Sequence, residues 1–247
     1  MALKASPESQ ALLLDLQAVD TKLAQLTHRA KALPQHAAIA KLTAEMDELR
    51  ITALAQSGAA EDVQIEIGRI ESDVAVVAAR IKRDTERSQA STSAKDAQAF
   101  EHELANLAKR QYDLEEIELT VMEKLEEREA ALAATTAQIE SLQTQIDAIV
   151  AERDAELIVL EKDIADTRAD RATVAGTIPA DLLALYDKLR LQKNGVGAAE
   201  LRQRRCTGCQ LGIDFAELAV IKAAPADLVV RCEECSRILV RTPESGI

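Results

Sequence analysis

The fold is decided by the stretch IAKLTAEMDELRITALAQSGAAEDVQIEIGRIESDVAVVAARI, residues 39–81. Apolar or small residues recur in it at alternating steps of three and four, and Gln56 is the single polar exception. Steps that average 3.5 residues form the heptad repeat of a coiled coil, whose helices bury such a seam against each other. The seam positions are Ile39, Leu42, Met46, Leu49, Ala53, Gln56, Ala60, Val63, Ile67, Ile70, Val74, Val77 and Ile81. The stretch therefore predicts one long helix that packs along a partner helix.

The same repeat precedes this stretch, in a segment with a clear helix start. Ser6 can cap the helix, Pro7 suits its first position, and Glu8 suits the positive end of the helix dipole. Pro34 then interrupts the repeat, because proline lacks the amide hydrogen and its ring clashes with the preceding turn. The seam positions of this earlier segment are Leu12, Leu16, Val19, Leu23, Leu26, Ala30 and Leu33. We expect two helices in a row, separated at Pro34.

An uncharged stretch, SQASTS at residues 88–93, separates this seam from a second one. Ser93 followed by Asp96 resembles a capping box, which would start a returning helix. The second seam comprises Phe100, Leu104, Leu107, Gln111, Leu114, Glu118, Val121, Leu125, Arg128, Leu132, Thr135, Ile139, Leu142, Ile146 and Ile149. Folding the chain about residue 92 places Gln56 opposite Arg128, and these side chains either reach solvent or form a polar layer that fixes the register. We therefore expect a mostly α-helical protein, with an antiparallel coiled-coil hairpin over residues 1–176.

A short helix followed by a hinge is expected over residues 177–197. The segment from Ala180 to Lys193 is rich in leucine and follows a proline, which favours a helix. Gly195 and Gly197 come next, and glycine permits positive φ angles, so this segment predicts a flexible joint. Residues 198–247 have a different composition and are expected to form a separate small domain.

All four cysteines lie in the last 42 residues, in two C-x-x-C pairs that are 22 residues apart. The pairs are Cys206 with Cys209 and Cys232 with Cys235. This spacing is typical of a zinc ribbon, in which two knuckles direct four sulfurs at one tetrahedral site. Two disulfides or a redox-active pair are the alternatives, but the spacing and a reducing compartment favour one structural Zn²⁺. Four thiolates leave no open position, so we expect no catalysis at the metal.

The segment around the cysteines is too small to fold on its own core, so we expect the metal to supply much of its folding energy. Residues 228–231 and 238–241 flank the second knuckle and predict a β-hairpin, and residues 215–223 predict a short helix between the knuckles. Cations near the anionic metal site would be stabilising. The candidates are Arg204, Arg205, Arg231 and Arg237.

Composition limits the classes of partner. The net charge is −12, which opposes general binding to a polyanion because such affinity comes from neutralising phosphates. No apolar run approaches the length of about 20 residues that spans a bilayer, and residues 1–10 lack a signal-peptide pattern. We expect a cytoplasmic protein that does not interact with membranes.

The sequence offers no recognisable catalytic constellation. His28, His36 and His102 lie far apart on the predicted hairpin, and solvated helix positions explain them. There is no glycine-rich phosphate loop, nucleophile elbow or metalloprotease motif. We do not expect an enzyme.

Several stretches together resemble a bacterial C4-type zinc-ribbon family, in which a long coiled-coil hairpin carries a C-terminal ribbon and which includes a flagellar-assembly chaperone. The resemblance implies zinc binding by the four cysteines, and binding to proteins or to nucleic acid; nothing in the sequence indicates a flagellar role. Ser236 departs from the family pattern, which has Gly after the last cysteine. The matching stretches are Leu33-Pro34, Lys95 to Leu104, Leu114-Glu115-Glu116, Ile178-Pro179, Leu185-Tyr186-Asp187, Gly195-Val196-Gly197 and Arg237-Ile238-Leu239.

The leading hypothesis is therefore a chaperone-like adaptor that binds partner proteins through its ribbon and its helical hairpin. The alternative is a nucleic-acid-binding protein that acts through the ribbon. Arg202, Arg204 and Arg205 favour the alternative, but basic and acidic side chains are equal in number from residue 194 to 247, seven of each. Phe215 is the only aromatic residue there, so no platform for stacking bases is evident. A homo-oligomeric coiled coil is a third possibility.

Overall fold

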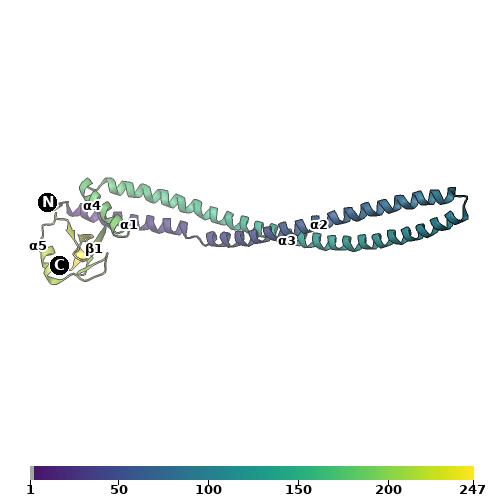
Figure 1. Ribbon diagram of the computed structural model, residues 1–247. Coiled ribbons are helices and arrows are strands. Elements are labelled where there is room, and N and C mark those ends of the chain that lie inside the picture. The colour runs from purple at the N-terminus through teal and green to yellow at the C-terminus, as the bar shows by residue number, and fades with distance from the viewer. Residues whose placement is uncertain (1–2) are drawn as a thin grey trace. The chain divides into compact units, whose positions relative to one another are not determined.

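The computed structural model describes residues 3–247 and divides the chain into two compact units. One unit comprises residues 37–150, and the other combines residues 1–36 with residues 151–247. The elements are coloured along the chain in Figure 1. Among the described residues, no helix combines the length and the apolar character that crossing a membrane requires.

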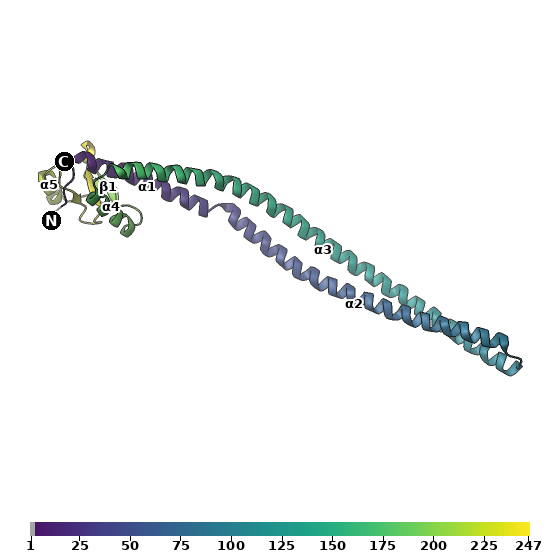
Figure 2. The same ribbon diagram turned by 90° about the horizontal axis from the view of Figure 1, so that it is seen from above.

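The unit of residues 37–150 is an antiparallel pair of helices. It contains most of α2 (Pro34–Ala90) and the first part of α3 (Ala94–Gly176), which lie side by side in both views (Figures 1 and 2). Every predicted seam position in this unit is buried or half-buried except Arg128, which is exposed. One core cluster of the seam contains Met46, Leu142 and Ile146, with Ile39, Leu42, Leu49, Ile139 and Val150 packed against it. The predicted coiled-coil hairpin is confirmed, because burial follows the 3-4 repeat.

The turn between these helices is shorter than predicted. Only residues 91–93 are non-helical. The Ser93 hydroxyl accepts a hydrogen bond from the Asp96 amide at 3.4 Å, as a cap should. The Ser93 amide donates to the Ser91 hydroxyl at 3.3 Å. In a capping box, the Asp96 side chain would accept the hydrogen bond from the Ser93 amide. Here the Ser91 hydroxyl accepts it instead.

The second unit begins with α1 (Pro7–Lys31), whose start is the predicted one. The Ser9 amide donates to the Ser6 hydroxyl at 3.2 Å, and Pro7 occupies the first turn. The helix ends at Lys31, and α2 begins at Pro34 itself, where the missing amide hydrogen costs nothing. The interruption at Pro34 is thus confirmed as a break between two helices.

The ribbon contains a four-stranded sheet in the order β2-β1-β4-β3. The predicted hairpin pairs β3 (Val230–Arg231) with β4 (Ile238–Arg241), and the predicted helix is α5 (Phe215–Ala223). Two further strands were not predicted. β1 (Ala198–Arg202) runs parallel to β4, and it pairs with the short β2 (Arg205–Cys206) in antiparallel fashion. A three-residue helical turn, η1 (Pro243–Ser245), closes the described chain.

The ribbon and the helices beside it share one hydrophobic core, so the expected boundaries at residues 176 and 197 do not separate independent domains. The shared cluster takes Leu13 and Leu16 from α1 and three residues from α4 (Ala180–Gln192). It is completed from the sheet by Ala198, Ile238 and Val240. The sheet, α1 and α4 therefore pack together within this unit.

The predicted hinge is correspondingly a packed segment. Gly195 has a φ of 87° just after α4, and its amide donates to the Arg190 carbonyl at 2.9 Å, which ends the helix. A Cβ atom on Gly197 would lie 2.6 Å from the backbone oxygen of Tyr186 and 2.9 Å from its ring. Gly197 is therefore required for close packing, and it does not serve as a flexible joint.

The first described residues also join the ribbon. The Ala5 amide donates to the Asp227 carbonyl at 2.8 Å, and the Val229 amide donates to the Leu3 carbonyl at 3.0 Å. Lys4 adds an exposed ion pair to the Asp227 carboxylate at 3.0 Å. The segment before α1 thus joins the ribbon through an isolated antiparallel bridge between Lys4 and Leu228.

Candidate metal centre

The two C-x-x-C knuckles have the same backbone geometry. In the first, the Gln210 amide donates to the Cys206 carbonyl at 2.7 Å, and in the second the Ser236 amide donates to the Cys232 carbonyl at 2.8 Å. The residue after each last cysteine has a positive φ, 63° at Gln210 and 62° at Ser236. Each knuckle therefore turns back so that both of its sulfurs face the other knuckle.

The four sulfurs fit a tetrahedral zinc ion. All four Sγ atoms lie within 4.8 Å of one another, and the Cys206–Cys235 and Cys209–Cys232 sulfurs are both 3.9 Å apart. A Zn–S bond of about 2.3 Å in tetrahedral geometry places sulfurs about 3.8 Å apart. A disulfide needs a separation of about 2.05 Å, and all four cysteines are free. The geometry supports the predicted ligand set and disfavours the disulfide alternative.

The surroundings shift the pKa values of Cys232 and Cys235 in opposite directions. Burial raises the pKa of Cys232 to about 12. Burial also raises the pKa of Cys235, but hydrogen bonds with the Arg237 backbone and side chain, Cys232 and Cys209 together outweigh it and lower the pKa to about 7. Bound zinc needs all four as thiolates, so metal binding at neutral pH releases protons from the buried sulfurs.

A second hydrophobic cluster surrounds the metal ligands. Cys206 and Cys232 are buried in it together with Ala199, Leu201, Leu218, Ile221 and Leu239. The cluster is small, and Gly208 is packed so tightly that a Cβ there would lie 2.8 Å from the Arg237 side chain. The cysteines are thus part of the hydrophobic packing on their side of the ribbon.

The arginines that were predicted to offset the anionic metal site are mostly used to hold the backbone. Arg237 donates to the carbonyls of Val196 and Lys193, both at 3.0 Å. Arg231 donates to the Ser236 carbonyl at 2.9 Å. Arg204 and Arg205 likewise donate to carbonyls, of Gly246 at 3.1 Å and Gln210 at 3.2 Å. Of the four, Arg237 also contacts a ligand, Cys235.

Arg241, which the sequence analysis did not single out, has the most extensive role of this kind. Its guanidinium donates to five carbonyls between α5 and β3. The acceptors are those of Ile221, Ala224, Pro225, Ala226 and Leu228. This side chain fixes the path of the chain into the second knuckle.

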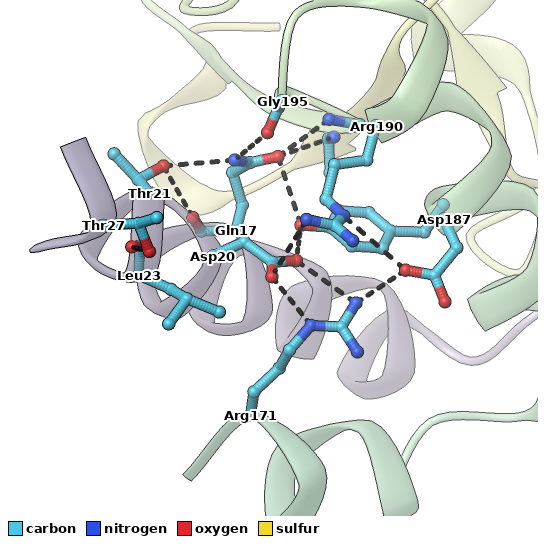
Figure 3. Close-up of polar contacts among 12 residues, drawn as sticks. Gln17, Asp20, Thr21, Leu23, Thr27, Arg171, Asp187, Arg190 and Gly195 are labelled. Atoms are coloured by element: carbon cyan, nitrogen blue, oxygen red, sulfur yellow. Dashed lines mark hydrogen bonds and ion pairs between the residues drawn. The ribbon is translucent and has the colours of Figure 1, made fainter. Parts of the chain in front are cut away.

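A buried polar network centred on Asp20 anchors the ribbon to the helices. Figure 3 shows the Asp20 carboxylate of α1 facing Arg171 and Arg190. Arg171 Nε lies 2.7 Å from one carboxylate oxygen, and the Tyr186 hydroxyl donates to the other at 2.8 Å. Arg171 also pairs with Asp187 at 2.6 Å. Charges of α1, α3 and α4 are thus neutralised at one buried point.

The network raises the pKa of two of its members. The hydrogen bond to Asp20 raises the pKa of Arg171. Burial, together with the Asp20 carboxylate, raises the pKa of the Tyr186 hydroxyl. Both groups therefore keep their proton and donate to Asp20 over the whole physiological pH range.

Gln17 carries the network into the ribbon. Its side-chain oxygen accepts from the Gly197 amide at 2.8 Å, and its amide nitrogen donates to the Gly195 carbonyl at 2.9 Å (Figure 3). The Tyr186 hydroxyl lies 3.3 Å from the same side-chain oxygen. Gln17 therefore pairs with the Gly195 carbonyl and with the Gly197 amide, in the segment that leads into β1.

The predicted seam of α1 does not reveal this network. Asp20 and Gln17 fall outside the predicted seam of α1, and polar residues there were assigned to the solvated face. Their spacing from Leu13, at steps of four and three, was the available signal of a second buried face. The histidines were placed correctly, since His28, His36 and His102 are all exposed.

The comparisons with known proteins agree with the geometry. The model of the CT398-like coiled coil hairpin domain matches residues 16–194, and that of the C4-type zinc ribbon domain matches residues 205–239. The chain belongs to the CT398-like coiled-coil hairpin family. The family resemblance inferred from the sequence is thereby confirmed.

Relatives of similar length span almost the whole chain. An uncharacterized protein of Mycobacterium tuberculosis is 34% identical over 240 residues, which is 97% of this chain and 98% of that protein. A solved structure from Mycobacterium smegmatis is 36% identical with a TM-score of 0.87, covering 97% of this chain and all of the other. The structure of CT398 from Chlamydia trachomatis has a TM-score of 0.70 at 20% identity, covering 95% and 98%. The fold is thus shared across the CT398-like family.

Proposed function

We propose that the protein is a zinc-binding scaffold that presents its ribbon to partner proteins as a rigid head. The observation that carries this proposal is the shared core, in which Leu13 and Leu16 of α1 pack with Ile238 and Val240 of the ribbon. A recognition surface held on rigid elements loses little conformational entropy on binding. In this proposal one structural Zn²⁺, held by Cys206, Cys209, Cys232 and Cys235, maintains that surface.

An adaptor fits the metal centre better than an enzyme does. Four sulfur ligands complete the coordination of zinc and leave no position for water or substrate. The Asp20 network is also closed, because each carboxylate in it faces a guanidinium and Tyr186 keeps its proton. Neither cluster offers a free base or nucleophile, so our proposal includes no catalytic step.

Partner proteins also fit the ribbon better than nucleic acid does. Arg231, Arg237 and Arg241 donate to backbone carbonyls of the chain itself. Arg202 is paired with Glu244 at 2.8 Å. Cations committed in this way are not available to neutralise phosphates, which supply most of the affinity for nucleic acid.

A pull-down from native cytosol tests the proposal. The baits are the intact chain, Cys232→Ser, and Thr207→Ser as a matched control that lies in a knuckle without binding metal. The proposal is supported if proteins stay bound to the intact chain and to Thr207→Ser after nuclease treatment. The same proteins should not bind Cys232→Ser. If the retained material disappears with nuclease, nucleic acid is the ligand and the proposal fails. It also fails if the intact chain retains nothing beyond a bead control.

A further inference from the structure

Helix α5 exposes two large apolar side chains to solvent. Phe215 is 77% exposed and Val220 is 69% exposed, although Leu218 and Ile221 of the same helix are buried in the ribbon. Phe215 and Val220 are five residues apart, so they lie on different sides of the helix. Phe215 shares its face of α5 with Ala219 and Lys222, and this is the face considered for a partner.

A pocket of about 260 Å³ lies along this face. Its apolar lining is contributed by Phe215, Leu218, Ala219 and Ile247. This volume suits one large aliphatic or aromatic side chain from a partner. The remaining lining residues are Arg204, Lys222 and Gly246.

The charged side chains that line this pocket are both basic. Arg204 places its guanidinium 5.9 Å from the centre of the Phe215 ring, and Lys222 lies among the lining residues. Neither has an ion pair within residues 3–247, and no acidic side chain lines the pocket. Arg204 donates to the Gly246 carbonyl through Nε only, so its two terminal nitrogens remain for a ligand, together with the Lys222 ammonium.

We propose that this pocket binds an acidic segment of a partner protein, with one bulky apolar side chain in the pocket and flanking carboxylates paired with Arg204 and Lys222. This inference rests on the proposed function, because it assigns the adaptor a docking site and the chemistry of its ligand. The positive charges of Arg204 and Lys222 favour a ligand with carboxylates. A second copy of this chain fits less well, since most of its other exposed large apolar side chains, such as Ile51 and Leu54, are fixed on long helices and are not in an extended segment.

Single-stranded nucleic acid is the competing occupant, because an exposed aromatic ring beside two cations can stack a base. The structure favours the peptide. A nucleic-acid groove follows the backbone with many cations, whereas this pocket has two and is otherwise apolar.

The test uses the zinc-loaded full chain with labelled Ile, Leu and Val methyl groups, observed by NMR. The probe is a short blocked peptide in which a central Leu-Phe pair is flanked by Glu and Asp. Comparison probes carry Ser in place of Leu-Phe, or Lys in place of the acids, and a fourth probe is oligothymidine. We expect the acidic apolar peptide to shift the methyl signals of Leu218 and Ile247 and to leave those of Leu54 unchanged.

Two variants and two controls test the assignment. Phe215→Ala and Lys222→Glu should each raise the Kd of the acidic apolar peptide by about tenfold, which corresponds to the loss of one strong contact. Val220→Ala removes an equally exposed apolar side chain of α5 outside the pocket, and Lys162→Glu makes the same charge change on α3. Both controls should bind as the unaltered chain does. Because Phe215 is exposed, Phe215→Ala should leave the remaining methyl spectrum unchanged.

The other outcomes overturn the inference. Shifts at Leu218 and Ile247 with oligothymidine but not with the peptide would identify a base-stacking site. No shift with any probe, or equal shifts with the Lys-containing peptide, would exclude an acidic ligand. The inference can fail alone: if Phe215→Ala and Lys222→Glu still retain the nuclease-resistant partners of the pull-down, the adaptor stands and its docking site lies elsewhere.

Discussion

Arg171 Nε lies 2.7 Å from Asp20 Oδ1, and the Asp20 side chain is 1% exposed. The two residues are 151 positions apart, on α1 and near the end of α3. Removing one partner of a buried ion pair is costly because the other charge stays buried without compensation. The pair therefore makes the attachment of α1 to its surroundings sensitive to a single substitution.

We expect Asp20→Ala to lower the free energy of unfolding of this unit by about 3–5 kcal/mol, because it leaves the Arg171 guanidinium and the Tyr186 hydroxyl without their acceptor. Urea denaturation followed by circular dichroism measures the change. Asp15→Ala, at an exposed position of the same helix, is the control and should change stability little. Equal midpoints for the two variants would contradict the role of Asp20.

The pH dependence of stability should reveal the raised pKa of the Tyr186 hydroxyl. Its pKa is raised in the folded protein, so the unfolded chain loses this proton first. The contribution is fully present below the ordinary tyrosine pKa of about 10 and falls by about 1.4 kcal/mol per pH unit above it. The stability of the unaltered chain should therefore drop more steeply above that pH than the stability of Tyr186→Phe.

Tyr112→Phe is the control for this titration, because Tyr112 is 61% exposed on α3. Its stability curve should follow that of the unaltered chain. Parallel curves for the unaltered chain and Tyr186→Phe above pH 10 would show that the hydroxyl is not buried against Asp20.

Metal removal should affect α1 as well as the ribbon. Stripping the metal with a chelator unfolds a small ribbon, and here it would also expose Leu13 and Leu16 of the shared core. Hydrogen exchange should therefore lose protection in residues 10–20 and 198–241, while residues 40–85 keep theirs. Loss confined to residues 198–241 would mean that the ribbon folds independently of α1. Elemental analysis of the untreated protein should give one zinc per chain.

Ser236→Gly should stabilise the second knuckle. Ser236 has a φ of 62°, a left-handed conformation that costs about 1–2 kcal/mol for a residue with a side chain. Glycine removes most of this cost but adds entropy to the unfolded chain, so we expect a net gain of about 0.5–1 kcal/mol. Thermal unfolding of the zinc-loaded protein measures it, with Gly208→Ala as a counterpart that should destabilise the first knuckle by collision with Arg237.

Gln56→Leu tests the polar seam position. The Gln56 side-chain oxygen is buried, and it has no hydrogen-bond partner among residues 3–247. Leucine removes this unsatisfied acceptor, so we expect the melting temperature of the residue 37–150 unit to rise. Sedimentation should show whether the oligomeric state changes as well. If neither quantity changes, the glutamine has no role in fixing the register.

The parts of the fold that depend on local pattern were predictable. The 3-4 repeat of α2 and α3, the cap at Ser6 and the two knuckles each depend on residues close together in sequence. Burial follows the seam at every predicted position of residues 39–81. The exposed Arg128 shows that a polar residue at a seam position can reach solvent.

Parts that depend on distant contacts were not predictable. β1 pairs in parallel with β4, although Ala198 and Ile238 are 40 positions apart and β1 has no repeat that marks it as a strand. The two glycines before β1 were read as a hinge, since glycine permits both flexibility and close approach. Only the Tyr186 ring beside Gly197 distinguishes the two roles.

The pairing of Leu3 and Ala5 with the ribbon has a consequence for the order of events during synthesis. The partners, Asp227 and Val229, leave the ribosome more than 220 residues later. Leu13 and Leu16 of α1 also emerge early, whereas the later buried members of their cluster begin at Ile178. The apolar face of α1 therefore stays exposed on the nascent chain during most of its synthesis, which favours aggregation in that interval.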